Sequence, residues 1–161
     1  MSKKIAFYPG TFDPPTTGHL DMIHRAAGLF EHVVVGVAKN PAKAPLISFE
    51  ERRALLLACV KPHWPNVSVV GFEGLTVRTA QEHGAKVLLR GLRAVSDFEH
   101  EFMMAQMNKT LCRELETVFL MAALEHQFVS SSLVKEVAKL GGDISAYVPE
   151  PVVGYFKQRH L

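Results

Sequence analysis

The amino-acid sequence predicts an α/β protein with a Rossmann-like, doubly wound parallel sheet of five strands and helices on both faces. Short β-rich apolar runs alternate along the chain with segments whose apolar residues recur at helical spacing. The runs are apolar throughout, which is typical of parallel strands buried on both faces. The 161 residues are 48% hydrophobic and 21% charged, a balance that favours one folded domain over residues 1–161 and excludes a disordered chain.

The first two strands and the helix between them follow from simple patterns. Residues 5–8 predict a strand, which Pro9 and Gly10 end. After a pair of prolines, residues 18–30 predict a helix, because apolar side chains recur there at intervals of three and four residues. Residues 33–38 are rich in valine and predict the second strand.

A capping box predicts where the next helix begins. The Ser48 hydroxyl can accept from a free backbone amide, while the Glu51 carboxylate reaches back to the amide of Ser48. The helix that follows is expected to turn four apolar side chains inward, namely Phe49, Leu56, Leu57 and Val60. Residues 67–70 predict the third strand.

The same alternation continues to the C-terminus. The remaining elements are helices at residues 77–83, 97–107 and 130–140 and strands at residues 87–89 and 118–121. Gly141 and Gly142 end a helix because glycine tolerates the left-handed conformation found there. A last helix is expected to begin at Pro151, where the missing amide proton does no harm.

Charge and cysteine content exclude several classes of function. The net charge is only +2, from 18 basic and 16 acidic residues, which argues against a nucleic-acid-binding surface. Cys59 and Cys112 lie far apart without CxxC spacing, so neither a disulfide framework nor a thiolate zinc site is expected, and a cytoplasmic protein is favoured. The longest apolar stretches, at residues 54–60 and 118–124, fall far short of the roughly 18 residues of a membrane span.

The most unusual residues follow the first predicted strand, at the edge of the sheet where α/β proteins bind ligands. The segment from Gly10 to His19 reads GTFDPPTTGH and matches neither the P-loop nor the GxGxxG pattern. Gly10 allows a tight exit from the strand, and Gly18 lets a ligand approach the start of the next helix. Because a helix N-terminus favours an anion, His19 is predicted to stay neutral there unless a negative group compensates.

Three further segments are expected at the same edge. Arg90 and Arg93 flank Gly91 after the fourth strand, and guanidinium groups suit the binding of phosphate. Lys43 lies in a proline-rich loop after the second strand. Residues 130–132, all serines, follow the fifth strand, and three hydroxyls exceed what one N-cap needs. Surface charges, a solvated lysine and a simple helix cap are the ordinary alternatives.

The residue types present favour one class of chemistry. The sequence contains no HExxH zinc helix, no GxSxG elbow and no acidic cluster for two metals. A site of neutral and cationic groups suits substrates that carry the negative charge, as in nucleotidyl transfer to a phosphate. A phosphate monoester, with a second pKa of about 6, is already mostly ionised at pH 7. The protein then only aligns the substrates and neutralises developing charge.

Four stretches, GTFDPPTTGH, KNPAKAP, LLRGLRAVSDFEHE and FVSSSLVKEVA, together resemble the bacterial phosphopantetheine adenylyltransferase family. The TxGH motif alone marks only the wider nucleotidyltransferase superfamily, whereas RGLRAVSDFEHE is more particular to this family. The resemblance extends to about residue 150 and implies one nucleotidyltransferase domain. It implies transfer of the adenylyl group of ATP, with Mg²⁺, to 4′-phosphopantetheine. The products are 3′-dephospho-coenzyme A and pyrophosphate, the penultimate step of coenzyme A biosynthesis.

The resemblance also implies roles for individual residues. The implied catalytic residues are His19, Thr11, Lys43 and Arg93. The implied ATP-binding residues are Gly10, Thr11, His19, Gly91, Leu92, Arg93, Glu101, His126, Gln127, Phe128, Val129, Ser130, Ser131 and Ser132. The implied phosphopantetheine-binding residues are Thr11, Lys43, Thr76 and Arg90. No protein ligand for the metal is implied. A homohexamer and feedback inhibition by coenzyme A are implied as well.

Several alternatives stay open at this point. His126 stands where the family often has an aromatic residue, and Thr76 replaces a larger apolar one found in some members. Another small nucleotidyltransferase, with nicotinamide mononucleotide or glycerol phosphate as its substrate, would share the TTGH turn. A non-catalytic nucleotide or coenzyme A sensor is a second alternative. The methionines at 103, 104 and 107 fit either the core or a subunit interface.

Overall fold

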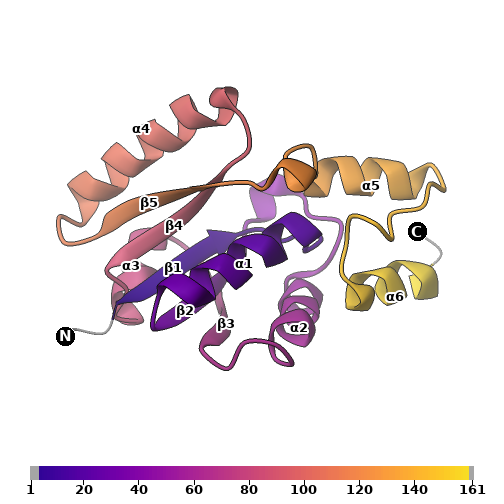
Figure 1. The fold of residues 1–161 in the computed structure, drawn as a ribbon, viewed down its shortest axis with the longest axis horizontal. Coiled ribbons are helices and arrows are strands. Elements are labelled where there is room, and N and C mark those ends of the chain that lie inside the picture. The colour runs from indigo at the N-terminus through magenta and orange to yellow at the C-terminus, as the bar shows by residue number, and fades with distance from the viewer. Residues whose placement is uncertain (1–3, 160–161) are drawn as a thin grey trace.

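A five-stranded parallel sheet forms the centre of the protein, as the sequence predicts. The computed structural model describes residues 4–159. Its strands are β1 (Ile5–Gly10), β2 (His32–Ala38), β3 (Val67–Phe72), β4 (Val87–Leu92) and β5 (Glu116–Met121). They are paired in the order β3-β2-β1-β4-β5, with every pairing parallel (Figure 1). The strand order reverses between β1 and β4, so a crevice is expected at the carboxyl ends of those two strands.

Residues 4–159 also form six α-helices and two short 3₁₀ turns, of which α1 to α4 and η1 lie between strands and η2, α5 and α6 follow the last strand. The helices are α1 (Thr17–Leu29), α2 (Phe49–Val60), α3 (Thr76–Glu82), α4 (Val95–Leu111), α5 (Ser131–Lys139) and α6 (Glu150–Arg159). The 3₁₀ turns η1 (Pro41–Lys43) and η2 (Leu124–His126) were not predicted, because three residues are too few to show a periodic pattern. The predicted capping box is present, with the Glu51 amide donating to the Ser48 hydroxyl at 3.3 Å.

Helices cover both faces of the sheet, which confirms the doubly wound arrangement. On one face, Tyr8 of β1 packs with side chains of α1 and α2 in the largest apolar cluster. On the other face, the neighbouring residue Phe7 packs with Val77 and Ala80 of α3. Successive residues of a strand point to opposite faces, so each buried strand supplies both clusters.

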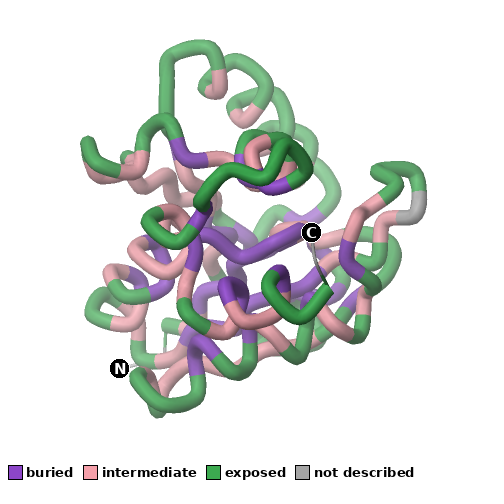
Figure 2. Tube along the Cα trace, turned by 90° about the vertical axis from the view of Figure 1, so that its right-hand side faces the viewer, coloured by how far each residue is buried: buried purple, intermediate pink, exposed green. Residues whose placement is uncertain are grey.

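The C-terminal helices form a third apolar cluster next to the carboxyl edge of the sheet. It joins α5 and α6 to Ile47, the residue that precedes the cap of α2. Figure 2, which is viewed from the side of these helices, shows buried residues through the middle of the molecule and exposed residues around them. The segment between α5 and α6 also holds the start of α1, because the Thr17 amide donates to the Tyr147 carbonyl at 2.9 Å.

Helix α4 is the main departure from the expected core. None of its residues is buried, and Met103 is 70% exposed. The core interpretation of the methionines at 103, 104 and 107 is therefore wrong for the single chain, in which Phe98 and Phe102 are also half exposed. Leu57, expected to point inward from α2, is 42% exposed as well. The helix period was correct in both cases, but among residues 4–159 these side chains keep between 42% and 70% of their surface exposed.

Two further observations concern the described residues alone. None of the helices between residues 4 and 159 combines the length and the apolar character needed to cross a membrane. Cys59 and Cys112 are both buried free thiols, and burial raises the pKa of Cys59 to about 11. A high pKa suppresses the thiolate form, so Cys59 fits a core position and not a nucleophile.

Candidate active site

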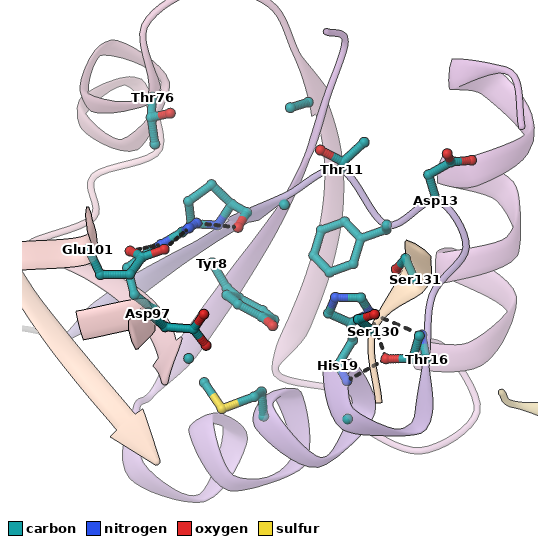
Figure 3. A pocket seen from close by; sticks show the side chains of 18 of the residues that line it. Tyr8, Thr11, Asp13, Thr16, His19, Thr76, Asp97, Glu101, Ser130 and Ser131 are labelled. Atoms are coloured by element: carbon teal, nitrogen blue, oxygen red, sulfur yellow. Dashed lines mark hydrogen bonds and ion pairs between the residues drawn. The ribbon is translucent and has the colours of Figure 1, made fainter. Parts of the chain in front are cut away.

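A cleft of about 1100 Å³ opens at the carboxyl ends of β1 and β4, where the strand order reverses. Its walls come from the ends of all five strands and the segments that follow them, from the starts of α1, α3 and α5, and from one side of α4. In the view of Figure 3, His19, Thr16, Ser130 and Ser131 gather on one side of the cleft, and Thr76 and Glu101 lie on the other. The tertiary structure thus brings the separate predicted segments to one place.

Most of the predicted site residues line this cleft. They are Gly10, Thr11, His19, Lys43, Thr76, Arg90, Gly91, Arg93, Glu101, His126, Val129, Ser130, Ser131 and Ser132. Three others lie outside its walls. Leu92 is buried in the sheet, and Gln127 and Phe128 are exposed beside η2, where the Phe128 ring packs edge-on against Tyr147.

His19 occupies the third position of α1 and forms a reciprocal cap with Thr16. The Thr16 hydroxyl accepts from the His19 amide at 3.3 Å, and the Thr16 amide donates to Nδ1 of His19 at 3.0 Å. This is a capping box in which histidine takes the usual place of glutamate or glutamine. Because Nδ1 accepts a hydrogen bond, the neutral ring carries its proton on Nε2.

The surroundings of His19 keep the imidazole neutral. Burial, with a smaller contribution from the positive charge of Arg93, lowers the pKa of His19 from 6.5 to about 4. The ring packs edge-on against Phe12, with the two centroids 4.9 Å apart. Phe12 in turn needs Gly10, because a Cβ atom there would lie 2.8 Å from the Phe12 ring. Glycine at the end of β1 is thus required by packing, which the sequence interpretation of a tight exit did not include.

Two arginine side chains line the cleft, and each forms an ion pair with a carboxylate. Arg90 donates through Nη2 and Nε to Glu101 at 2.6 and 2.8 Å, and through Nη1 to the Pro9 carbonyl at 3.1 Å. Arg93 donates from Nε to Asp97 at 3.3 Å. The pair with Glu101 raises the pKa of Arg90. Glu101 thus orients the guanidinium of Arg90, and remaining Arg90 N–H groups stay available to a ligand.

Hydroxyl groups add to the polar surface of the cleft. The Thr11 hydroxyl lies 3.5 Å from the Lys43 ammonium, which joins the loops after β1 and β2. Ser130 caps α5 by accepting from the Leu133 amide at 3.1 Å, so the capping role predicted for one serine is confirmed. The Ser131 hydroxyl donates to the Pro14 carbonyl at 2.7 Å and thereby joins α5 to the loop before α1.

The carboxylates of the cleft do not form a metal cage. Asp13, Asp97 and Glu101 each pair with a basic side chain, namely Lys135, Arg93 and Arg90. Within residues 4–159, His, Cys, Asp and Glu side chains nowhere gather in a group of three that could hold a metal ion.

Sequence reasoning missed three residues that build the cleft. Thr16 positions His19, and its signal was present as a capping residue three positions before the histidine. Asp13 is only 4% exposed, and its carboxylate accepts a hydrogen bond from the Lys135 ammonium at 2.6 Å. The Asp13–Lys135 pair had no local signal, because its members are 122 residues apart in the sequence.

Known proteins match this chain over nearly its whole length. It is 52% identical over 158 residues to a protein named phosphopantetheine adenylyltransferase from Xylella fastidiosa strain 9a5c, covering 98% of this chain and 97% of that protein. The same identity and coverage hold for the phosphopantetheine adenylyltransferase of strain M23. The chain belongs to the phosphopantetheine adenylyltransferase family. This confirms the family that the four sequence stretches resemble.

Two broader comparisons place that family in its fold. The model of the cytidylyltransferase-like family matches residues 7–137, which run from β1 into α5. A crystal structure described as a nicotinate-nucleotide adenylyltransferase from Vibrio parahaemolyticus superimposes with a TM-score of 0.75, covering 98% of this chain and 94% of that one. At 18% identity this second likeness shows the shared Rossmann-like fold alone. The phosphopantetheine adenylyltransferase family thus uses a nucleotidyltransferase scaffold.

Proposed function

We propose that this protein transfers the adenylyl group of ATP to 4′-phosphopantetheine, producing 3′-dephospho-coenzyme A and pyrophosphate. The proposal is carried by the 52% identity to phosphopantetheine adenylyltransferases across 98% of the chain. The chemistry of the cleft supports the same reaction. The cleft combines a neutral imidazole, cations and hydroxyl groups on one edge of the sheet, which suits two substrates that carry all the negative charge.

The acceptor phosphate acts as the nucleophile. One of its oxygens attacks the α-phosphorus of ATP. The bond from that phosphorus to the oxygen that bridges the α- and β-phosphorus atoms breaks, so pyrophosphate leaves with the electron pair. The acceptor needs no general base, because a phosphate monoester with a second pKa of about 6 is mostly ionised at pH 7. Lys43, Arg90 and Thr11 are the groups that we assign to this phosphate, with Thr76 near the pantetheine arm.

His19 is assigned to the ATP side. With its proton on Nε2, the neutral ring donates a hydrogen bond to a phosphate oxygen of ATP where negative charge grows in the transition state. Arg93 and residues 130–132 surround the same region and add a guanidinium and three hydroxyl groups. The reaction then depends on alignment and charge stabilisation by these groups.

Mg²⁺ enters this proposal as a partner of ATP. The three carboxylates that line the cleft in the described chain are engaged by basic side chains, so the triphosphate oxygens are the natural ligands for the ion. When bound, the ion neutralises phosphate charge. We assign no protein ligand to it.

We also propose a homohexamer and feedback inhibition by coenzyme A. The apolar surface of α4 supports assembly, because Val95, Phe102 and Met103 are exposed by 87%, 47% and 70%. Coenzyme A combines an adenine nucleotide with a pantetheine arm, so it has the groups for which both sides of the cleft are proposed. The two free cysteines are consistent with a cytoplasmic location.

Pyrophosphate release tests the proposed reaction. Purified protein is mixed with Mg²⁺, ATP and 4′-phosphopantetheine, and the acceptor is omitted in the control. Acceptor-dependent release together with dephospho-coenzyme A supports the proposal. Release only with nicotinamide mononucleotide, or with CTP and glycerol phosphate, would assign a different nucleotidyl transfer. Binding of ATP without turnover of any acceptor would indicate a sensor.

A further inference from the structure

Arg52 of α2 is a buried guanidinium with an unusual set of partners. It is 1% exposed, and in the described part of the chain it forms no ion pair. It donates from Nε to the Ile47 carbonyl at 3.1 Å, and from Nη1 to the carbonyls of Ala38, at 3.0 Å, and Thr11. Removing a charged group from water is costly, so an arginine held by three carbonyls calls for an explanation.

The three carbonyls lie in or at the ends of the two loops to which we assign the acceptor side of the cleft. Ala38 ends β2, and Ile47 ends the loop that follows, so Arg52 holds both ends of residues 39–46. This loop contains Lys43. The third carbonyl is that of Thr11, whose hydroxyl lies 3.5 Å from the Lys43 ammonium. One guanidinium therefore links the loop that carries Thr11 to both ends of the loop that carries Lys43.

Asp13 holds the same loop from the other side. Its carboxylate accepts from the amides of Leu46 and Ile47 at 3.0 and 2.9 Å and from the Lys135 ammonium at 2.6 Å. Ile47 thus donates its amide to Asp13 and offers its carbonyl to Arg52. Two buried side chains of opposite charge thus hold the end of this loop, one through the amide of Ile47 and the other through its carbonyl.

We propose that Arg52 is a positioning residue for the acceptor side, which holds the loop of Lys43 against the loop of Thr11 and so keeps these two side chains together. The role rests on the proposed adenylyl transfer. The ATP side has hydrogen bonds of its own that do not involve Arg52, from Ser131 to Pro14 and between His19 and Thr16. Loss of the guanidinium therefore acts on one substrate more than on the other.

The test compares Arg52→Lys with a matched control on the same helix. Lysine keeps the charge but cannot span three carbonyls with one ammonium group. Arg53 is exposed, so Arg53→Lys makes the same chemical change at the neighbouring position without touching either loop. The kcat and the KM for each substrate are measured by pyrophosphate release well below the unfolding temperature of each variant.

We expect Arg52→Lys to raise the KM for 4′-phosphopantetheine about tenfold and to lower kcat, with the KM for ATP changed less than about threefold. Arg53→Lys should match the wild type. A folded Arg52→Lys protein with all three constants within about twofold of wild type would show that Arg52 only supports the fold. An equal rise in both KM values would overturn its assignment to the acceptor side.

A second variant and a second readout cover the remaining outcomes. If Arg52→Lys does not fold, Arg52→Gln keeps an amide donor for the carbonyls without burying an unpaired charge, and it should give the same preference for the acceptor KM. A folded Arg52→Gln enzyme without that preference would then contradict the proposal. Hydrogen exchange needs no activity. In Arg52→Lys the amides of Leu46 and Ile47 should exchange faster. The Leu133 amide, which donates to the capping hydroxyl of Ser130 in α5, should exchange at the wild-type rate. A wild-type enzyme without turnover would reject the proposed function, and the exchange data would still test the positioning role.

Discussion

Thr16 and His19 hold each other across the first turn of α1. The Thr16 amide donates to Nδ1 of His19 at 3.0 Å, while the His19 amide donates to the Thr16 hydroxyl at 3.3 Å. This pair of bonds caps the helix and also selects the ring tautomer. The TTGH motif thus combines a structural role for its threonine with a neutral donor, Nε2–H, at the edge of the cleft.

Removal of the His19 ring should reduce turnover much more than stability. We expect His19→Ala to lower kcat by roughly 10²–10³-fold, the scale for losing one preorganised charge-stabilising group. The sheet and both main apolar clusters do not depend on the polar atoms of this ring. His24, exposed on the same helix, provides the control variant His24→Ala. Near wild-type kcat in folded His19→Ala protein would remove His19 from the transition state.

The low pKa of His19 should be visible in the pH dependence of stability. Between pH 6.5 and about 4 the unfolded state binds a proton that the folded state does not, so the free energy of unfolding falls as the pH falls. The stabilisation by the neutral His19 ring is complete above about pH 7.5 and should decrease by about 2 kcal/mol between about pH 7.5 and 5, with a slope that approaches about 1.4 kcal/mol per pH unit between the two pKa values. Urea unfolding of wild type and His19→Asn at both pH values measures it. Parallel pH dependences of the two proteins would contradict the lowered pKa.

Arg90 should govern binding of the acceptor. Arg90→Ala removes the guanidinium that Glu101 orients, and we expect a rise of about tenfold or more in the KM for 4′-phosphopantetheine. Glu101→Gln should give a smaller effect in the same direction, because it weakens the orientation but leaves the guanidinium in place. Arg113→Ala, at an exposed position before β5, is the control. A loss confined to ATP affinity would move Arg90 to the nucleotide side.

The apolar surface of α4 should control assembly. Met103→Asp places a charge at a position that is 70% exposed in the single chain, so it should leave the fold intact and reduce the size of the particle. Light scattering after size exclusion measures the mass. Leu140→Asp is the control, because Leu140 is an apolar residue that is 83% exposed at the end of α5. An unchanged mass for Met103→Asp would exclude α4 from the interface.

The boundaries of the elements show where local sequence patterns stop being informative. The fourth strand was predicted at residues 87–89 but continues through Arg90 and Gly91 to Leu92. A charged residue and a glycine do not look like a buried strand, yet pairing with Phe119 and Leu120 of β5 extends it. Helix α4 is also longer than residues 97–107, because residues at both ends continue the helix although nothing buries them. Long-range pairing and exposed helical turns leave little trace in local hydrophobicity.

The sequence by itself determined the parallel α/β class, the strand-to-helix turn with His19, and the segments that line the cleft. Each of these depends on neighbours close in the chain, such as an apolar run, a capping residue or a glycine. Only the tertiary structure decided that Glu101 binds Arg90, that Asp13 binds Lys135, and that Arg52 reaches the carbonyls of Thr11 after β1 and of Ala38 at the end of β2. These contacts join residues that are far apart in the chain or in different loops. They form because a parallel sheet brings the carboxyl ends of its strands to one edge.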